Sequence, residues 1–340
     1  RLYSMPNEVL INVAHLSRHF PGRTHQTVAV DDISFTLNRG EILGFLGPNG
    51  AGKSTTMQML TGNLAPSHGQ ITIGGIDLMD DPIQAKAQIG YLPDTPPLYK
   101  ELTVNEYLAY CARLNKIPKQ QVRAALDSAR QRCGLSEYGH RVISHLSKGF
   151  QQRVGIAQAI IHSPDIVILD EPTVGLDPIQ MVEIRKLIKE LGKQHSVMLS
   201  SHILPEIQAI CSQVQIINQG KLIFNAPIEQ LNQQMQTQAL RMRCTASVDL
   251  SLIENLPNVH SVEVEQLDDS VLIHYKAENP QLQNSNPVSS VQVSQELIKL
   301  SLTNNWGLYE IFPEKRTLED IFMTLTHEDT VAAEHYSTGT

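Results

Sequence analysis

Long apolar runs are absent from this sequence of 340 residues. A helix that crosses a bilayer needs about 18 to 20 consecutive apolar residues, whereas runs here, such as Ile166–Leu169, have the length of a strand. We therefore expect that the chain does not cross a membrane by itself. Residues 1–4 also lack the charged-then-apolar layout of a signal peptide, and we expect the natural start at Met5.

Cysteine is scarce, and its positions match no functional motif. The four cysteines, Cys111, Cys133, Cys211 and Cys244, have neither metal-binding nor redox spacing. Scattered thiols of this kind favour a reduced, cytosolic protein. No disulfide framework is expected.

An excess of basic residues is missing as well. The chain has 27 lysines and arginines against 35 aspartates and glutamates, a formal net charge of -8. Nucleic acids and anionic lipids are bound through basic surfaces. This balance argues against either of them as the main partner, and no nucleic acid is expected.

The length and the apolar pattern indicate a large α/β domain followed by a smaller one. Residues 9–20 and 28–38 alternate apolar and polar side chains, which predicts an antiparallel sheet. Residues 102–162 have helical spacing throughout. Two apolar runs, 165–170 and 196–200, then flank a predicted helix, and this alternation is typical of a parallel sheet.

A glutamine-rich stretch over residues 230–238 marks the expected boundary. Beyond it the pattern predicts strand, helix, strand, strand, helix and strand, then a last helix over 318–325, which is typical of a small ferredoxin-like α+β module. The expected domains are a nucleotide-binding domain over 5–230 with a helical part at about 100–162, a linker over 231–238, an accessory domain over 239–326 and a flexible tail over 327–340.

A phosphate-binding loop follows the strand predicted over residues 41–46. The motif G-x-x-x-x-G-K-[ST] is matched by Gly47, Pro48, Asn49, Gly50, Ala51, Gly52, Lys53 and Ser54, where a predicted helix begins. The glycines let backbone N–H groups turn toward phosphates, and the helix N-terminus adds positive partial charge. Lys53 is predicted to reach the β- and γ-phosphates of ATP and Ser54 to ligate Mg²⁺. Thr55 completes the predicted nucleotide-binding set.

Two adjacent acids end the apolar run at residues 166–169. Ligands bind open α/β sheets at the carboxyl ends of strands, where Asp170 and Glu171 are expected. Asp170 is the predicted acid for Mg²⁺, directly or through water. Glu171 is the predicted general base that accepts a proton from the attacking water.

Between these motifs lies Leu146-Ser147-Lys148-Gly149-Phe150. With it, residues 9–230 resemble the nucleotide-binding domain of ATP-binding cassette (ABC) transporters, whose L-S-G-G-Q signature it matches in the first, second and fourth places. The resemblance implies an ABC-type P-loop NTPase fold with a RecA-like core, an antiparallel β subdomain and a helical subdomain. It also implies that Ser147 and Gly149 contact the γ-phosphate held by a second copy of the chain. Phe150 replaces the usual Gln, and Gln151 follows one place later.

Other family elements are matched by single residues. Asp177, in Gly-Leu-Asp-Pro, resembles the acid of the D-loop at the subunit interface, and His202 resembles the switch histidine that holds the γ-phosphate and the water in line. Phe20 lies where the family places an aromatic that stacks on adenine. A core or edge-strand role for Phe20 is an equal alternative, and His19 is a second candidate for adenine.

Asp94 stands where the family usually has the Gln of its Q-loop. An aspartate is anionic and one methylene shorter than Gln, so it favours a cation more strongly but has a shorter reach. We expect Asp94 to couple the metal to residues 95–99, which would lie against a membrane partner.

Three features resemble the ATPases of type-two exporters: residues 96–104, the variant signature, and the C-terminal segments 306–308 and 317–322. This resemblance implies an ATPase subunit that dimerises around two ATP molecules and drives export by a separate transmembrane permease. The expected location is the cytoplasmic face of the inner (plasma) membrane. Two alternatives are a soluble ABC ATPase of the translation or DNA-repair type, and a non-hydrolysing scaffold, which the intact Glu171 argues against.

Overall fold

The computed structural model describes residues 8–22, 26–256, 259–264, 270–275 and 290–315. The chain forms two compact units, Arg1–Glu229 and Gln230–Thr340, which are treated separately below. Among the described residues, no helix is both long enough and apolar enough to span a bilayer. The last predicted helix and the predicted tail lie outside the described residues.

The first sheet of unit one is antiparallel. Its strands, in the order β2-β1-β4-β5, are β1 (Val9–Phe20), β2 (Thr27–Asn38), β4 (His68–Ile73) and β5 (Ile76–Asp77). Leu10, Val13 and Leu16 of β1 and Phe35 and Leu37 of β2 are buried. The alternation in the sequence therefore predicted this sheet correctly.

The second sheet carries the parallel strands. Its order is β10-β9-β3-β8-β7-β6, formed by β3 (Ile42–Leu46), β6 (Ile89–Leu92), β7 (Ile166–Leu169), β8 (Ser196–Ser201), β9 (Gln213–Asn218) and β10 (Lys221–Pro227). Only β10 runs antiparallel to its neighbour. Every residue of β7 and β8 is buried, because parallel strands have both faces covered.

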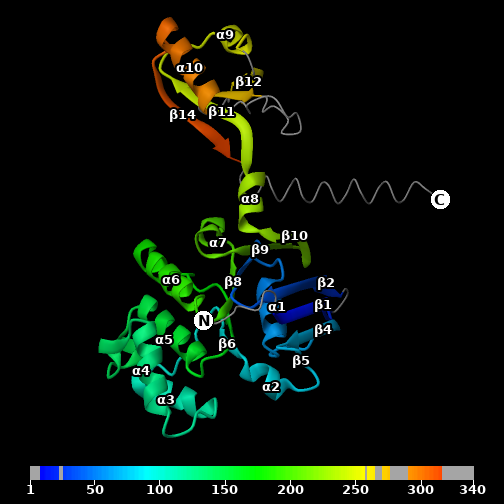
Figure 1. Cartoon of the computed structure of the whole chain (residues 1–340), viewed down its shortest axis with the longest axis vertical. Helices are drawn as coiled ribbons and strands as arrows, with labels where there is room; N and C mark the ends of the chain where they lie inside the picture. Colours follow the sequence, from blue (N-terminus) through cyan, green and yellow to red (C-terminus); the bar gives the residue numbers. More distant parts are fainter. Residues whose placement is uncertain (1–7, 23–25, 257–258, 265–269, 276–289, 316–340) are drawn as a thin grey trace, which may run out of the picture. The chain divides into compact units, whose positions relative to one another are not determined.

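The helices of this unit are α1 (Lys53–Leu60), α2 (Pro82–Ala87), α3 (Val104–Leu114), α4 (Val122–Arg132), α5 (Lys148–Ile160), α6 (Pro178–Leu191) and α7 (Leu204–Ile210). Figure 1 shows α3, α4 and α5 grouped at the end of the unit away from β1 and β2. The predicted helical segment is thus present, but it is not helical throughout: two 3₁₀ turns, Ser136–Tyr138 and Ile143–His145, and a bridge between Thr103 and Val142 interrupt it.

Helix α5 packs unusually close to β6. A Cβ on Gly90 of β6 would lie 1.9 Å from the carbonyl oxygen of Ala159 in α5, and one on Gly155 would lie 2.6 Å from Leu92 Cδ1. The two glycines therefore permit this approach. It joins the helix that begins beside Ser147 to the strand that leads into Asp94.

In its described residues, unit two contains a four-stranded antiparallel sheet together with helices. Its elements are β11 (Gln236–Cys244), α9 (Leu250–Glu254), β12 (Val259–Val264), β13 (Val271–Tyr275), α10 (Ser290–Asn304) and β14 (Leu308–Lys315), and the strand order is β12-β13-β11-β14. The predicted order of strands and helices is therefore present in the described residues. Its core contains Leu240, Ile273, Leu297 and Trp306. Of residues 231–238, the predicted linker, 231–234 lie in α8 (Ile228–Gln234) and 236–238 at the start of β11.

Candidate functional site

The glycine-rich loop lies between β3 and α1. Gly50 and Gly52 have φ of 81° and 110°, a region that favours glycine. A Cβ on Gly47 would lie 2.3 Å from Ile217 O, and one on Gly52 would lie 2.5 Å from Ala29 O. The loop conformation therefore needs these glycines.

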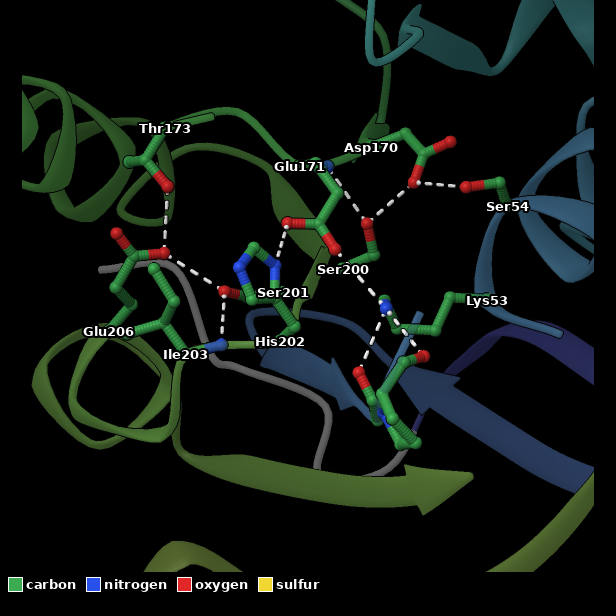
Figure 2. Close-up of polar contacts among 12 residues, drawn as sticks. Lys53, Ser54, Asp170, Glu171, Thr173, Ser200, Ser201, His202, Ile203 and Glu206 are labelled. Carbon is green, nitrogen blue, oxygen red and sulfur yellow. Dashed lines mark hydrogen bonds and ion pairs between the residues drawn. The ribbon is translucent and has the colours of Figure 1, made fainter. Parts of the chain in front are cut away.

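Lys53 lies inside this loop with 5% of its surface exposed. Its Nζ donates to Gly47 O at 2.8 Å and to Pro48 O at 3.2 Å, and it lies 3.2 Å from Glu171 Oε1. Figure 2 shows these contacts on one side of the site. The loop thus fixes the position of one ammonium group opposite the acids of β7.

Asp170 is buried at the end of β7. Its Oδ1 accepts hydrogen bonds from Ser200 Oγ at 2.6 Å and from Ser54 Oγ at 3.2 Å. Burial raises the pKa of the Asp170 carboxyl, the two hydroxyl groups oppose that rise, and repulsion from Asp94 and Glu171 adds to it. A cation beside Asp170 would stabilise its ionised form and so offset the effect of burial and of the neighbouring acids.

Glu171 connects the lysine to the histidine. Its Oε2 lies 3.0 Å from Nδ1 of His202, a half-exposed residue that follows β8, while its Oε1 contacts Lys53 (Figure 2). The backbone N–H of Glu171 donates to Ser200 Oγ at 2.8 Å. Glu171 has φ of 47°, which is uncommon for a residue with a side chain.

One cavity of about 360 Å³ brings most of the predicted phosphate-site residues together. It is lined by Ala29, Asn49, Gly50, Gly52, Lys53, Ser54, Thr55, Asp94, Glu171, Val174 and His202. Asp170 borders it through its contact with Ser54. Asp94 accepts a hydrogen bond from the backbone N–H of Thr95 at 2.6 Å. The segment that follows β6 therefore begins at a residue that lines the cavity.

The residues predicted to contact adenine are not among those that line this cavity. Phe20, at the end of β1, does not line it, and the guanidinium of Arg18 lies 4.6 Å from the centre of its ring. The ring of His19 packs edge-on against that of His68. Contact of Phe20 or His19 with adenine therefore stays a prediction.

The signature residues line a second cavity of about 220 Å³. Ser147 is the N-cap of α5, and Gly149 packs against Gln180. Asp177 caps α6 by accepting the N–H of Gln180 at 2.9 Å, and it lines the same cavity as Ser147. No residue lines both this cavity and the one with Lys53.

The departure from the family signature has a structural explanation. The Phe150 ring packs on Tyr138 with centroids 4.2 Å apart. Gln151, one place later, donates to Leu146 O at 2.9 Å and so binds the backbone of its own loop. In this chain the glutamine stabilises the signature loop from within.

Ser200 is a site residue that was not predicted from the sequence. This buried hydroxyl of β8 binds both the Asp170 carboxylate and the Glu171 backbone. The only signal in the sequence was a pair of serines directly before His202, at the carboxyl end of a strand.

The donor set fits a magnesium ion. Among the described residues no three His, Cys, Asp or Glu side chains converge on one point. Mg²⁺, however, is usually held by one or two carboxylates together with phosphate oxygens and water. The buried Asp170 next to the Ser54 hydroxyl supplies such a partial set.

Comparisons with known proteins agree with this geometry. The family model described as ABC transporter matches residues 30–174. NatA of Bacillus subtilis (strain 168), an ABC transporter ATP-binding protein, is 37% identical over 233 residues, which cover 68% of this chain and 95% of NatA. The bacitracin transport ATP-binding protein BcrA of Bacillus licheniformis is 33% identical over 89% of this chain and 94% of BcrA. The structure of cbiO1 from Clostridium perfringens, described as part of the ABC transporter complex cbiONQ, has a TM-score of 0.61 at 28% identity and covers 67% of this chain and 92% of that one.

The match to the family model includes the phosphate loop, the signature and the two acids that follow β7. The matches to the relatives are longer. They extend over nearly the whole length of NatA and BcrA. The chain therefore belongs to the ABC transporter family and is one of its ATP-binding, ATP-hydrolysing proteins.

Proposed function

We propose that this chain is the ATPase subunit of an ABC exporter and that it hydrolyses ATP in the cavity between the phosphate loop and the acids of β7. The observation that carries the proposal is the convergence of Lys53, Glu171 and His202 on that cavity. Lys53 would bind the β- and γ-phosphates, since its ammonium is already fixed by two carbonyl groups of the loop.

Glu171 is the proposed general base. Its carboxylate lines the cavity and would take a proton from a water molecule that attacks the γ-phosphate. With an ionised Glu171, His202 Nδ1 carries the proton of their 3.0 Å contact, which orients the ring and leaves Nε2 for the phosphate or the water. Hydrolysis thus uses positioned groups on both sides of one small cavity.

Ser54 and Asp170 are proposed to hold Mg²⁺, with Asp94 close to them. The ion would neutralise charge on the β- and γ-phosphates. Ser200 would then keep Asp170 in place, because its hydroxyl donates to the same carboxylate oxygen as that of Ser54.

A second copy of the chain is the proposed dimer partner. Ser147, Gly149 and Asp177 share one cavity, and the phosphate residues line a different one. Two copies arranged head to tail would bring the Ser147 cavity of each chain over the nucleotide of the other. Each ATP would then be bound by both chains.

A transmembrane permease is the proposed second partner. A groove of about 690 Å³ runs along β6 and α3 and is lined by Pro97, Tyr99, Tyr107, Tyr110 and Leu114 among others. Tyr99 and Leu114 are exposed, and the segment with Pro97 and Tyr99 begins at Asp94 of the nucleotide cavity. The names of BcrA and cbiO1 refer to transport systems, which supports a permease as the partner. Bound to that permease, the chain would lie at the cytoplasmic face of the membrane.

Copurification of the tagged chain with membrane proteins of its host tests this function. We expect a polytopic permease in the wild-type sample and its loss with Leu114→Lys, which charges the groove at a residue that is 62% exposed. Val182→Lys, on an exposed position of α6, is the matched control and should retain the permease. Recovery of ribosomes or DNA instead would contradict the proposal.

A further inference from the structure

Glu206 is a buried acid close to the nucleotide cavity that does not line it. It lies in the first turn of α7 with 2% of its surface exposed. Within the described part of the chain, its Oε2 is bound by two hydroxyl groups and its Oε1 has no hydrogen-bond partner. A carboxylate is costly to bury in this way, so its position calls for a role.

The two hydroxyl groups come from the segments that carry the proposed hydrolytic residues. Thr173 Oγ1 donates to Glu206 Oε2 at 2.7 Å, and Ser201 Oγ donates to the same oxygen at 2.9 Å (Figure 2). Thr173 follows Glu171 by two residues, and Ser201 directly precedes His202. One carboxylate oxygen thus joins the segment after β7 to the end of β8.

The same contacts restrict the backbone around His202. Ser201 Oγ also accepts the N–H of Ile203 at 3.0 Å, so His202 lies between two residues held by one hydroxyl. Nδ1 of His202 lies 3.0 Å from Glu171 Oε2. The contacts therefore form a closed ring that runs from Glu206 through the segment after β7 and the end of β8. Glu171 itself has φ of 47°, a conformation that persists only where its surroundings hold it.

We propose that Glu206 is a positioning residue that holds Glu171 and His202 at the separation needed for hydrolysis. The proposal rests on the roles assigned above to Glu171 and His202. Glu206 acts through Thr173 and Ser201 and does not touch the nucleotide. A misplacement of about 1 Å can lower a rate about 100-fold, so loss of this link should reduce kcat and leave ATP binding almost unchanged.

Steady-state hydrolysis by the full chain tests the proposal. For Glu206→Ala we expect kcat to fall by about 10-fold or more while KM for ATP stays within about 2-fold. Glu206→Gln should recover most of the rate, because its amide oxygen still accepts from both hydroxyls. Ser201→Ala should lower kcat, and the double variant Glu206→Ala/Ser201→Ala should be no slower than Glu206→Ala, since the two residues act as one unit.

Ser196→Ala is the matched control. Ser196 is the first residue of β8 and Ser201 the last; both are buried, and Ser196 accepts the N–H of Gly40 far from the cavity. Equal kcat losses in Ser196→Ala and Ser201→Ala, or no advantage of Gln over Ala at position 206, would overturn the proposal. Should Glu206→Ala fail to fold, Glu206→Gln and Ser201→Ala still decide it. Glu171→Gln is measured beside them: if it is inactive and Glu206→Ala is fully active, the inference alone fails, whereas an active Glu171→Gln refutes the assigned base.

Discussion

At the scale of single residues, the site combines a buried lysine with three carboxylates. Lys53 neutralises Glu171, and Asp170 is stabilised by two hydroxyl groups. The third carboxylate is Asp94, which stands where the family usually has Gln. Its carboxylate lines the cavity and binds the backbone of the next residue, so it is placed to respond to a bound cation.

Asp94→Ala should therefore weaken the dependence of hydrolysis on magnesium. We expect the Mg²⁺ concentration for half-maximal activity to rise by about 5-fold or more, because an anionic oxygen donor is lost from the cavity. The measurement is a Mg²⁺ titration of phosphate release. Asp77→Ala, which removes a partly buried acid of β5 that lies outside the cavity, should leave the titration unchanged. An unaltered Mg²⁺ dependence in Asp94→Ala would remove this residue from the metal site.

The residues at the site differ in how far the sequence could predict them. Lys53, Ser54 and Asp170 belong to local motifs with known spacing, and the structure brings them together. Ser200 and Glu206 act through contacts about 30 residues away in the chain, at Asp170, Glu171 and Thr173, and no local pattern records such contacts.

At the scale of secondary structure, the same division applies. β1 and β2 have a clear alternation of apolar and polar residues, and β7 is a continuous apolar run, so all three were predicted. β6 has four residues and contains Gly90, and α7 has seven residues with a proline in its first turn, so neither has a clear period. Both are fixed by packing: β6 lies under α5, and α7 covers β3 at Gly44.

The contact between α4 and the parallel sheet depends on a neutral histidine. His195 Nδ1 donates to Pro164 O at 2.6 Å, and Arg132 of α4 donates to its Nε2 at 2.6 Å. Burial lowers the pKa of His195, and the nearby Arg132 charge lowers it further, while the Pro164 carbonyl and Asp165 oppose this. Burial also lowers the pKa of the neighbouring His162.

Acid should therefore destabilise this unit. Because the pKa of His195 is lower in the folded state than in the unfolded one, the unfolded state binds more protons as the pH falls below about 6.5, and the free energy of unfolding decreases there. Between pH 7.5 and 5.5 we expect Tm to fall by several degrees more in the wild type than in His195→Gln. Thermal unfolding at both pH values measures this. Identical pH dependence in the two proteins would contradict the role assigned to neutral His195.

At the scale of the whole molecule, one chain contains two separate halves of the proposed nucleotide site. The Lys53 cavity and the Ser147 cavity share no lining residue. If the Ser147 cavity of each chain covers the Lys53 cavity of the other, each ATP depends on Lys53 and Glu171 of one copy and on Ser147 of the other. Variants in different halves should then complement each other.

Mixing two inactive variants tests whether each site is formed by two chains. Lys53→Ala and Ser147→Arg should each be inactive, but their heterodimer contains one intact site. An equal mixture should recover up to about a quarter of wild-type activity, since half of the dimers are heterodimers with one of two sites intact. Lys53→Ala mixed with Glu171→Gln is the control and should stay inactive, because both changes lie in the same half. No recovery in the first mixture would contradict the shared site.

The central claim is hydrolysis of ATP by a base at Glu171, and the most direct measurement compares wild type with Glu171→Gln for both phosphate release and ATP binding. Gln retains the size and shape of the side chain, but one carboxylate oxygen is replaced by an NH₂ donor and the side chain cannot accept the proton. For Glu171→Gln we expect phosphate release to fall by about 100-fold or more while ATP still binds. Equal rates of phosphate release in the two proteins would contradict it.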